Sequence, residues 1–465
     1  MSRKRSGFCL SMVPIVELQT STSAHLERRL EERLEEKKKQ EGGASLDQML
    51  GKLTCADKQT PSTTDQPFHW HKGFNSTWVD MKWIATCVVC VSLFVRCAEV
   101  NETQDNLEVV FHLNDSTRVS FPLQQQNDLF TLQNGGEEME LLRTNDSTFV
   151  VPVFGGSWVL DSTERRGVWT DSLRSSNYHV DFDIQPRSSV INTGEAPEGT
   201  WDVWFGDRDT SAFADAQLDL QRVAGSMTGT MRTPTGDYRF FSGVYRSGLL
   251  HMQTYDGAHL YCFKARYSQG SWIDGSFYSG NHYHTQWSGR SGRVWPNGDT
   301  VEEIQVQDSD LLITTLDRNG SSVEVSLVPQ PGEVVVVDIL GTWCPNCMDE
   351  VRLLREVQEN HPGIRVISMA YERDTTALDV YRRLDFYRSQ LGINWEVYWG
   401  GAASKTIAAR TFPFLDQVLS FPTTLFIHPN GRVAIHSGFN GPATGAAYEA
   451  EKNKFNQLLS AAPGF

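Results

Sequence analysis

The chain has 465 residues, of which 39% are hydrophobic and 11% are aromatic, and it carries a formal net charge of −15. This length predicts two or three domains with substantial hydrophobic cores. The acidic balance excludes a nucleic-acid-binding surface, which requires a basic face. The eight cysteines are too few to form a disulfide scaffold in a chain of this length.

Residues 1–80 form a polar extension that we expect to be poorly structured. The charged run at 25–41 places leucine at only every fourth position, a stripe too narrow for a core helix. His69 and His71 are a weak metal signal, because protein metal sites use three or four ligands. We therefore expect no metal site in this extension.

The segment 81–97 is typical of an export signal. Met81 and Lys82 precede an apolar run from Trp83 to Val95. The run is shorter than the ~20 residues that span a bilayer, and it suits the apolar region of a secretory signal. Met81 is therefore the expected start of translation, with 1–80 as a mis-assigned extension. A buried strand of an ordinary domain is the alternative.

The end of this segment, LFVRC, resembles a lipoprotein processing box with Cys97 as the lipidated first residue of the mature chain. Arg96 departs from that box, which carries a small residue at this position. We expect export to the periplasm or cell envelope, with lipid anchoring at Cys97 as an option that Arg96 opposes.

Residues 98–327 are predicted to form a β-rich domain. Short runs such as LEVVFHL, RVSFPL and YHVDFDI are separated by turn residues, and 225–287 continues the pattern. Regular spacing without a helical period predicts an antiparallel β sandwich or barrel. His282 and His284 are interpreted as a solvent-facing pair, and Cys262 as a small buried hydrophobe. The aromatic residues would line a ligand cavity or fill the core.

Residues 328–465 have a different pattern. The run VVVVDIL at 334–340 is typical of a strand buried on both faces. A helical segment follows, and further strands and helices alternate until a hairpin whose turn is supplied by 429–431. This order predicts an α/β fold.

Cys344 and Cys347 lie where the buried strand meets the helix. Unpaired N–H groups and the helix dipole favour an anion there, so we expect the pKa of Cys344 to fall below the ~8.5 of free cysteine. Cys344 would be held ionised and exposed, so that it attacks another protein's disulfide. Cys347 would then resolve the mixed disulfide. Pro345 suits the first helical turn. A metal site would lack two further ligands, and a structural disulfide would close too small a loop to stabilise much.

The segment from about Val334 to Leu459 resembles exported thioredoxin-like thiol–disulfide oxidoreductases of the TlpA/ResA type. The motifs are DILGTWCPNC and SFPTTLFIHPNGRVAIHSGFNGPATG. The resemblance implies a thioredoxin-like fold and a redox-active Cys344–Cys347 disulfide without another cofactor. It also implies a cis Pro422 that faces the cysteines, with Phe421 offering its backbone to substrate.

The resemblance implies roles for neighbouring residues as well. Asp338 matches a buried acid that takes the proton of Cys347, and a raised pKa would suit this role. Glu350 matches an acid near the site, with a solvated or N-terminal-turn carboxylate as the alternative. Trp343 would shield the disulfide, and together with Pro345, Phe421 and Pro422 it would form the substrate-binding surface. Leu340 replaces an aromatic residue of thioredoxin.

The resulting hypothesis is an enzyme that reduces disulfides of exported substrate proteins and is recharged by a membrane electron donor. The β-rich segment resembles N-terminal domains fused to this redox module in some exported bacterial members. Two alternatives remain: a ligand-binding β-domain protein with an accessory redox module, and a thiol peroxidase. The peroxidase usually needs a lone peroxidatic cysteine with a neighbouring threonine. No oligomeric state is predicted.

Overall fold

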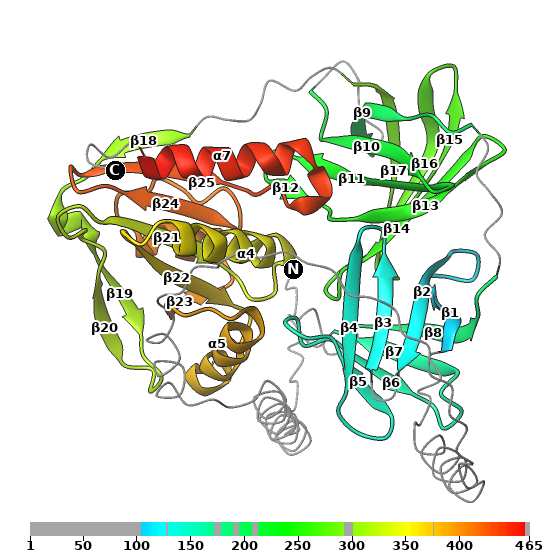
Figure 1. Ribbon diagram of the computed structural model, residues 1–465, viewed down its shortest axis with the longest axis horizontal. Coiled ribbons are helices and arrows are strands. Elements are labelled where there is room, and N and C mark those ends of the chain that lie inside the picture. The colour runs from blue at the N-terminus through cyan, green and yellow to red at the C-terminus, as the bar shows by residue number, and fades with distance from the viewer. Residues whose placement is uncertain are drawn as a thin grey trace, which may run out of the picture. The chain divides into compact units, whose positions relative to one another are not determined.

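The computed structural model describes residues 104–126, 129–171, 178–188, 195–206, 213–292, 301–374 and 376–460, which Figure 1 shows in colour. The expected extension at 1–80 and the expected signal at 81–97 lie outside these residues, as do His69, His71 and Cys97. Those interpretations therefore stay predictions. None of the described helices is long and apolar enough to span a bilayer.

The first part of the β-rich region is a closed antiparallel barrel in which β1 pairs with both β2 and β8. Its strands are β1 (Gln104–His112), β2 (Arg118–Gln126), β3 (Leu129–Asn134), β4 (Glu137–Arg143), β5 (Thr148–Val150), β6 (Ser157–Leu160), β7 (Arg166–Thr170) and β8 (His179–Pro186). Inward side chains follow the two-residue period of a strand, as Val119, Phe121 and Leu123 of β2 illustrate. Aromatic rings fill the barrel: Phe111 lies edge-on to Trp158, with 5.5 Å between their centroids.

The second part is a separate nine-stranded antiparallel sheet, in the order β10-β9-β17-β16-β15-β14-β13-β11-β12. Its strands are β9 (Gly199–Phe205), β10 (Ala216–Val223), β11 (Ser226–Thr233), β12 (Gly236–Asp237), β13 (Phe241–Arg246), β14 (Leu249–Tyr255), β15 (Leu260–Ser268), β16 (Ser271–Ser279) and β17 (Tyr283–Ser291). Because β10 also pairs with β11, the pairing of this sheet closes on itself. The antiparallel β-rich prediction is confirmed, but the region holds two closed units, whereas the sequence predicted one. As expected, Cys262 is fully buried while His282 and His284 are exposed.

The C-terminal sheet has eight strands in the order β18-β25-β24-β21-β22-β23-β19-β20. Its elements are β18 (Glu302–Gln305), a 3-10 turn η1 (Asp308–Leu311), β19 (Leu312–Leu316), β20 (Ser322–Ser326), β21 (Val334–Leu340), α4 (Pro345–Asn360), β22 (Ile364–Glu372), α5 (Ala377–Leu391), β23 (Glu396–Ala402), α6 (Lys405–Thr411), β24 (Thr423–Ile427), β25 (Arg432–Ser437), a 3-10 turn η2 (Pro442–Thr444) and α7 (Ala446–Ser460). Strand β21 runs parallel to β22 and antiparallel to β24. Every residue of β21 is buried, as its apolar sequence predicts.

The two faces of this sheet carry different helices. Val334 and Val336 on one face pack with buried residues of α4, α5 and α7, whereas Val335 and Val337 pack with Ala408 of α6. In Figure 1, α4 and α7 lie across the same side of the strands. The helix that follows β21 is therefore held against a rigid layer.

Strands β18, β19 and β20 precede residue 328 but belong to this sheet. Strand β18 pairs with β25, and β19 pairs with both β20 and β23. A boundary at 328 separates these strands from their partners. The sequence did not separate them from the preceding region because all are short antiparallel strands with the same two-residue pattern.

The barrel core provides a test of stability. Trp158 is fully buried and donates from Nε1 to the Tyr255 hydroxyl at 2.9 Å, while the adjacent Val159 is 44% exposed. We expect Trp158→Ala to lower the free energy of unfolding by about 3–5 kcal/mol, since it removes packing and leaves a cavity. Val159→Thr should stay within about 0.5 kcal/mol. Urea unfolding of both variants checks this, and equal losses would contradict the described barrel core.

Candidate functional site

The two cysteines lie at the junction between β21 and α4. Cys344 is the N-cap residue of the helix and Pro345 is its first residue. The backbone N–H of Cys347 donates to Sγ of Cys344 at 3.4 Å. A sulfur in this position takes the place of a capping oxygen. Both cysteines are free thiols in this structure.

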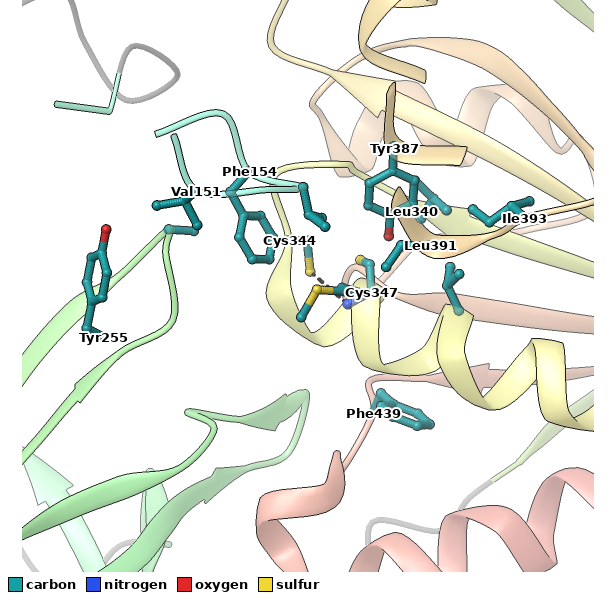
Figure 2. Packing of buried hydrophobic residues seen from close by; sticks show 14 of the residues in the cluster. Val151, Phe154, Tyr255, Leu340, Cys344, Cys347, Tyr387, Leu391, Ile393 and Phe439 are labelled. Carbon is teal, nitrogen blue, oxygen red and sulfur yellow. Dashed lines mark hydrogen bonds between the residues drawn. The ribbon is translucent and has the colours of Figure 1, made fainter. Parts of the chain in front are cut away.

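Burial differs from the expectation at one of the two thiols. Cys347 is fully buried, and Cys344 is only 8% exposed rather than open. Cys344 shares a hydrophobic cluster with Val151, Val153 and Phe154 of the barrel. Figure 2 shows the ring of Phe154 turned toward the sulfur of Cys344. The barrel loop that follows β5 thus covers the first thiol.

The loop before β24 lies against Cys344. The Phe421–Pro422 peptide bond is cis, as expected. Sγ of Cys344 donates to the Phe421 carbonyl at 3.5 Å. The ring of Phe421 lies edge-on to Trp343, with 5.6 Å between their centroids. The structure therefore brings Trp343, Phe421 and Pro422 together around the first thiol.

Trp343 is fixed by two further contacts. Its indole N–H donates to the Tyr371 carbonyl at 2.9 Å. The guanidinium carbon of Arg373 lies 4.5 Å from the centre of its ring, a cation–π arrangement. These contacts hold the indole at the edge of the site.

Two carboxyl groups are fully buried near the dithiol. Asp338, on β21, accepts a hydrogen bond from Ser368 at 3.0 Å, and burial raises its pKa to about 7. Glu350, on α4, accepts from Thr424 at 2.5 Å, and its pKa is raised by burial and then by Asp338. Within the described residues, Oδ1 of Asp338 and Oε2 of Glu350 have no hydrogen-bond partner. The alternative interpretation of Glu350 as a solvated carboxylate is wrong, because packing encloses this side chain.

The second thiol is electrostatically linked to these acids. Burial raises the pKa of Cys347 well above its ordinary value, and contacts with Cys344 and Asp338 raise it further. Cys347 is therefore a neutral thiol at neutral pH. An Asp338 carboxyl with a pKa near neutrality can accept a proton there, which a carboxyl of ordinary pKa does poorly.

Sequence reasoning missed several residues of this site. Tyr387 of α5 is fully buried, and burial followed by Cys347 raises its pKa. Phe154 and Arg239 also lie near the dithiol although they belong to the β-rich region. Tyr387 carried a weak local signal in its helical spacing, but no short motif marks Phe154 or Arg239. Among the described residues, no three His, Cys, Asp or Glu side chains are grouped to hold a metal ion.

No family model and no curated protein matches the chain. Solved structures that resemble part of it include DsbF from MTB, with 17% identity over 34% of this chain and 98% of that one at a TM-score of 0.25. A thioredoxin family thiol:disulfide interchange protein from Chlorobium tepidum has 19% identity over 33% and 94% of the two chains, with a TM-score of 0.24. A DsbF homologue from Corynebacterium diphtheriae has 21% identity over 35% and 95%, with a TM-score of 0.24.

The cover over Cys344 is open to a direct test. We expect Phe154→Ala to raise the rate at which iodoacetamide alkylates Cys344 by about tenfold, because the ring no longer restricts access to the sulfur. This factor corresponds to a free-energy difference of ~1.4 kcal/mol. The matched control is Phe213→Ala, because Phe213 is 96% exposed. Mass spectrometry of the modified peptide gives the rate. Equal rates in both variants would show that the ring does not restrict access.

The buried Asp338 predicts a pH dependence of stability. Its folded pKa of about 7 lies above the unfolded value near 3.9, so between these values the folded state holds a proton that the unfolded state has released. The stability from this proton is complete below about pH 4 and is lost as pH rises through 7. In urea unfolding, the free energy of unfolding of the wild-type protein should fall by up to ~1.4 kcal/mol per pH unit as pH rises toward 7. Asp338→Asn should remove this dependence on pH. An unchanged slope would contradict the assignment.

Proposed function

We propose that this protein is a thiol–disulfide oxidoreductase that reduces disulfides of substrate proteins. The observation that carries the proposal is the free Cys344 sulfur at the start of α4, with the Cys347 N–H donating to it and the Cys347 thiol one turn away. The Phe421 carbonyl, which accepts from this sulfur at 3.5 Å, supports it.

In the first proposed step, the Cys344 thiolate attacks one sulfur of the substrate disulfide. The substrate S–S bond breaks as the bond to Cys344 forms, and the released substrate sulfur takes a proton. The N–H of Cys347 stabilises the thiolate before attack. The backbone near Phe421 and the indole of Trp343 border the space that the incoming chain would occupy, while Pro345 fixes the first helical turn.

In the second proposed step, Cys347 loses its proton to Asp338 and attacks Sγ of Cys344. The Cys344–Cys347 disulfide forms, and the second substrate sulfur leaves and is protonated. Two electrons and two protons have then passed from the dithiol to the substrate. The pKa of Asp338 of about 7 leaves part of this carboxyl ionised at neutral pH and able to accept the proton, while the raised pKa values of Cys347 and Glu350 favour their neutral forms.

The cycle requires a dithiol reductant that returns the two electrons, and we assign this role to a membrane electron donor. Activity in the periplasm or cell envelope is part of the proposal, supported by the apolar run before Cys97. The motifs around Cys344 and Pro422 favour the TlpA/ResA type. The redox module would include β18, β19 and β20, because these strands complete its sheet.

The decisive experiment traps the mixed disulfide. Cys347→Ala in cells should accumulate covalent complexes with substrate proteins, because the resolving thiol is absent. Cys344→Ser should trap none and reduce insulin disulfides only at the uncatalysed rate. Non-reducing electrophoresis with mass spectrometry measures the complexes.

The matched control is Cys262→Ala, which removes the other free thiol of the described chain and should leave trapping and turnover intact. Rapid peroxide turnover without disulfide reduction would favour the peroxidase alternative. Full biological activity of Cys344→Ser would favour the ligand-binding alternative.

A further inference from the structure

Both residues between the two cysteines contact the second β-rich sheet. Nδ2 of Asn346 donates to the Asp237 carbonyl at 3.1 Å and to the Phe439 carbonyl at 3.3 Å. Nη1 of Arg239 donates to the Pro345 carbonyl at 3.2 Å. Asp237 ends β12 and Arg239 follows it closely, so one loop of that sheet holds the first turn of the redox helix.

Arg239 connects three parts of the described chain. Its guanidinium is almost fully buried and lies 2.5 Å from the carboxylate of Asp349 on α4. The same group is paired with Glu137, on β4 of the barrel. Its backbone N–H donates to the Asp237 carboxylate at 2.6 Å, and the other oxygen of Asp237 accepts from Gly441 N at 2.5 Å.

Carboxyl groups outnumber guanidinium groups in this cluster. One buried guanidinium faces the carboxyls of Asp237, Glu137 and Asp349, and Arg352 reaches Asp349 at 3.2 Å. Burial and Asp349 raise the pKa of Asp237 to about 6, and burial raises the pKa of Glu137. Removing one member leaves an uncompensated charge in a poorly solvated place beside the first turn of α4.

Such a charge acts differently on the two redox states. The reduced protein can hold a thiolate at Cys344, whereas the disulfide is neutral. A positive charge near the start of α4 favours the thiolate and stabilises the reduced form, and a negative charge does the opposite. The balance around Arg239 is therefore a means of setting the dithiol–disulfide equilibrium.

We propose that Arg239 is a positioning residue that sets the reduction potential of the Cys344–Cys347 couple from outside the α/β sheet. This inference rests on the proposed function, because it assumes that the couple is redox-active. In this arrangement the redox centre is complete only when the second sheet and the barrel are in place.

The test uses the full chain and a series of glutathione redox buffers at pH 7. Arg239→Gln leaves two negative charges uncompensated and should lower the potential, with the equilibrium constant changing about tenfold, or ~30 mV for a two-electron couple. Asp349→Asn keeps the guanidinium and removes a negative charge, so its shift should have the opposite sign. Glu137→Gln should shift the potential in the same direction as Asp349→Asn. These two variants test the inference even if Arg239→Gln fails to fold.

The matched controls are Arg318→Gln and Asp385→Asn, which break an exposed ion pair of the same types on the α/β sheet. Neither should move the potential. Shifts of one sign in all three cluster variants, or no shift beyond the controls, would overturn the inference and leave the proposed function standing. A wild-type dithiol that never equilibrates with glutathione would instead overturn the proposed function.

Discussion

The site depends on the junction between a fully buried strand and the first turn of a helix. Strand β21 is paired on both sides, with β22 and β24, so its end is fixed in space. The same strand carries Asp338 and leads directly to Cys344. Since successive side chains point to opposite faces, a one-residue shift of register would move Asp338 to the other side of the sheet. Strand pairing therefore fixes the acid and the thiol together.

Exclusion of water gives this junction its chemistry. Cys347, Asp338 and Glu350 are fully enclosed, and burial is the largest cause of the raised pKa of each. Groups coupled in this way exchange protons as a unit, so each titration depends on the state of the others. The Cys344 sulfur lies at the helix start, where the backbone N–H of Cys347 donates to it.

The sequence predicted the parts of this site that depend on near neighbours. The buried run 334–340 and the position of Cys344 where this strand meets a helix were predicted from neighbouring residues, whereas the cis bond before Pro422 was implied by the family resemblance; all three are present. The contacts of Phe154 and Arg239 are not encoded locally. Arg239 meets Pro345 across 106 residues of sequence, so its contact depends on how separate β units pack. The two-residue pattern also did not predict that the β-rich region divides into two closed units, because both units show the same pattern.

The pairing of β18 with β25 has a consequence for synthesis of the chain. Glu303 and Arg432 form an ion pair across this edge although 129 residues separate them. At a ribosomal rate of about 5–20 residues per second, β18 waits on the order of ten seconds for its partner. During that interval its backbone groups are unpaired and open to foreign strands. A ribosome that stalls before β25 would therefore leave a nascent chain in which β18 has no partner and is prone to aggregate.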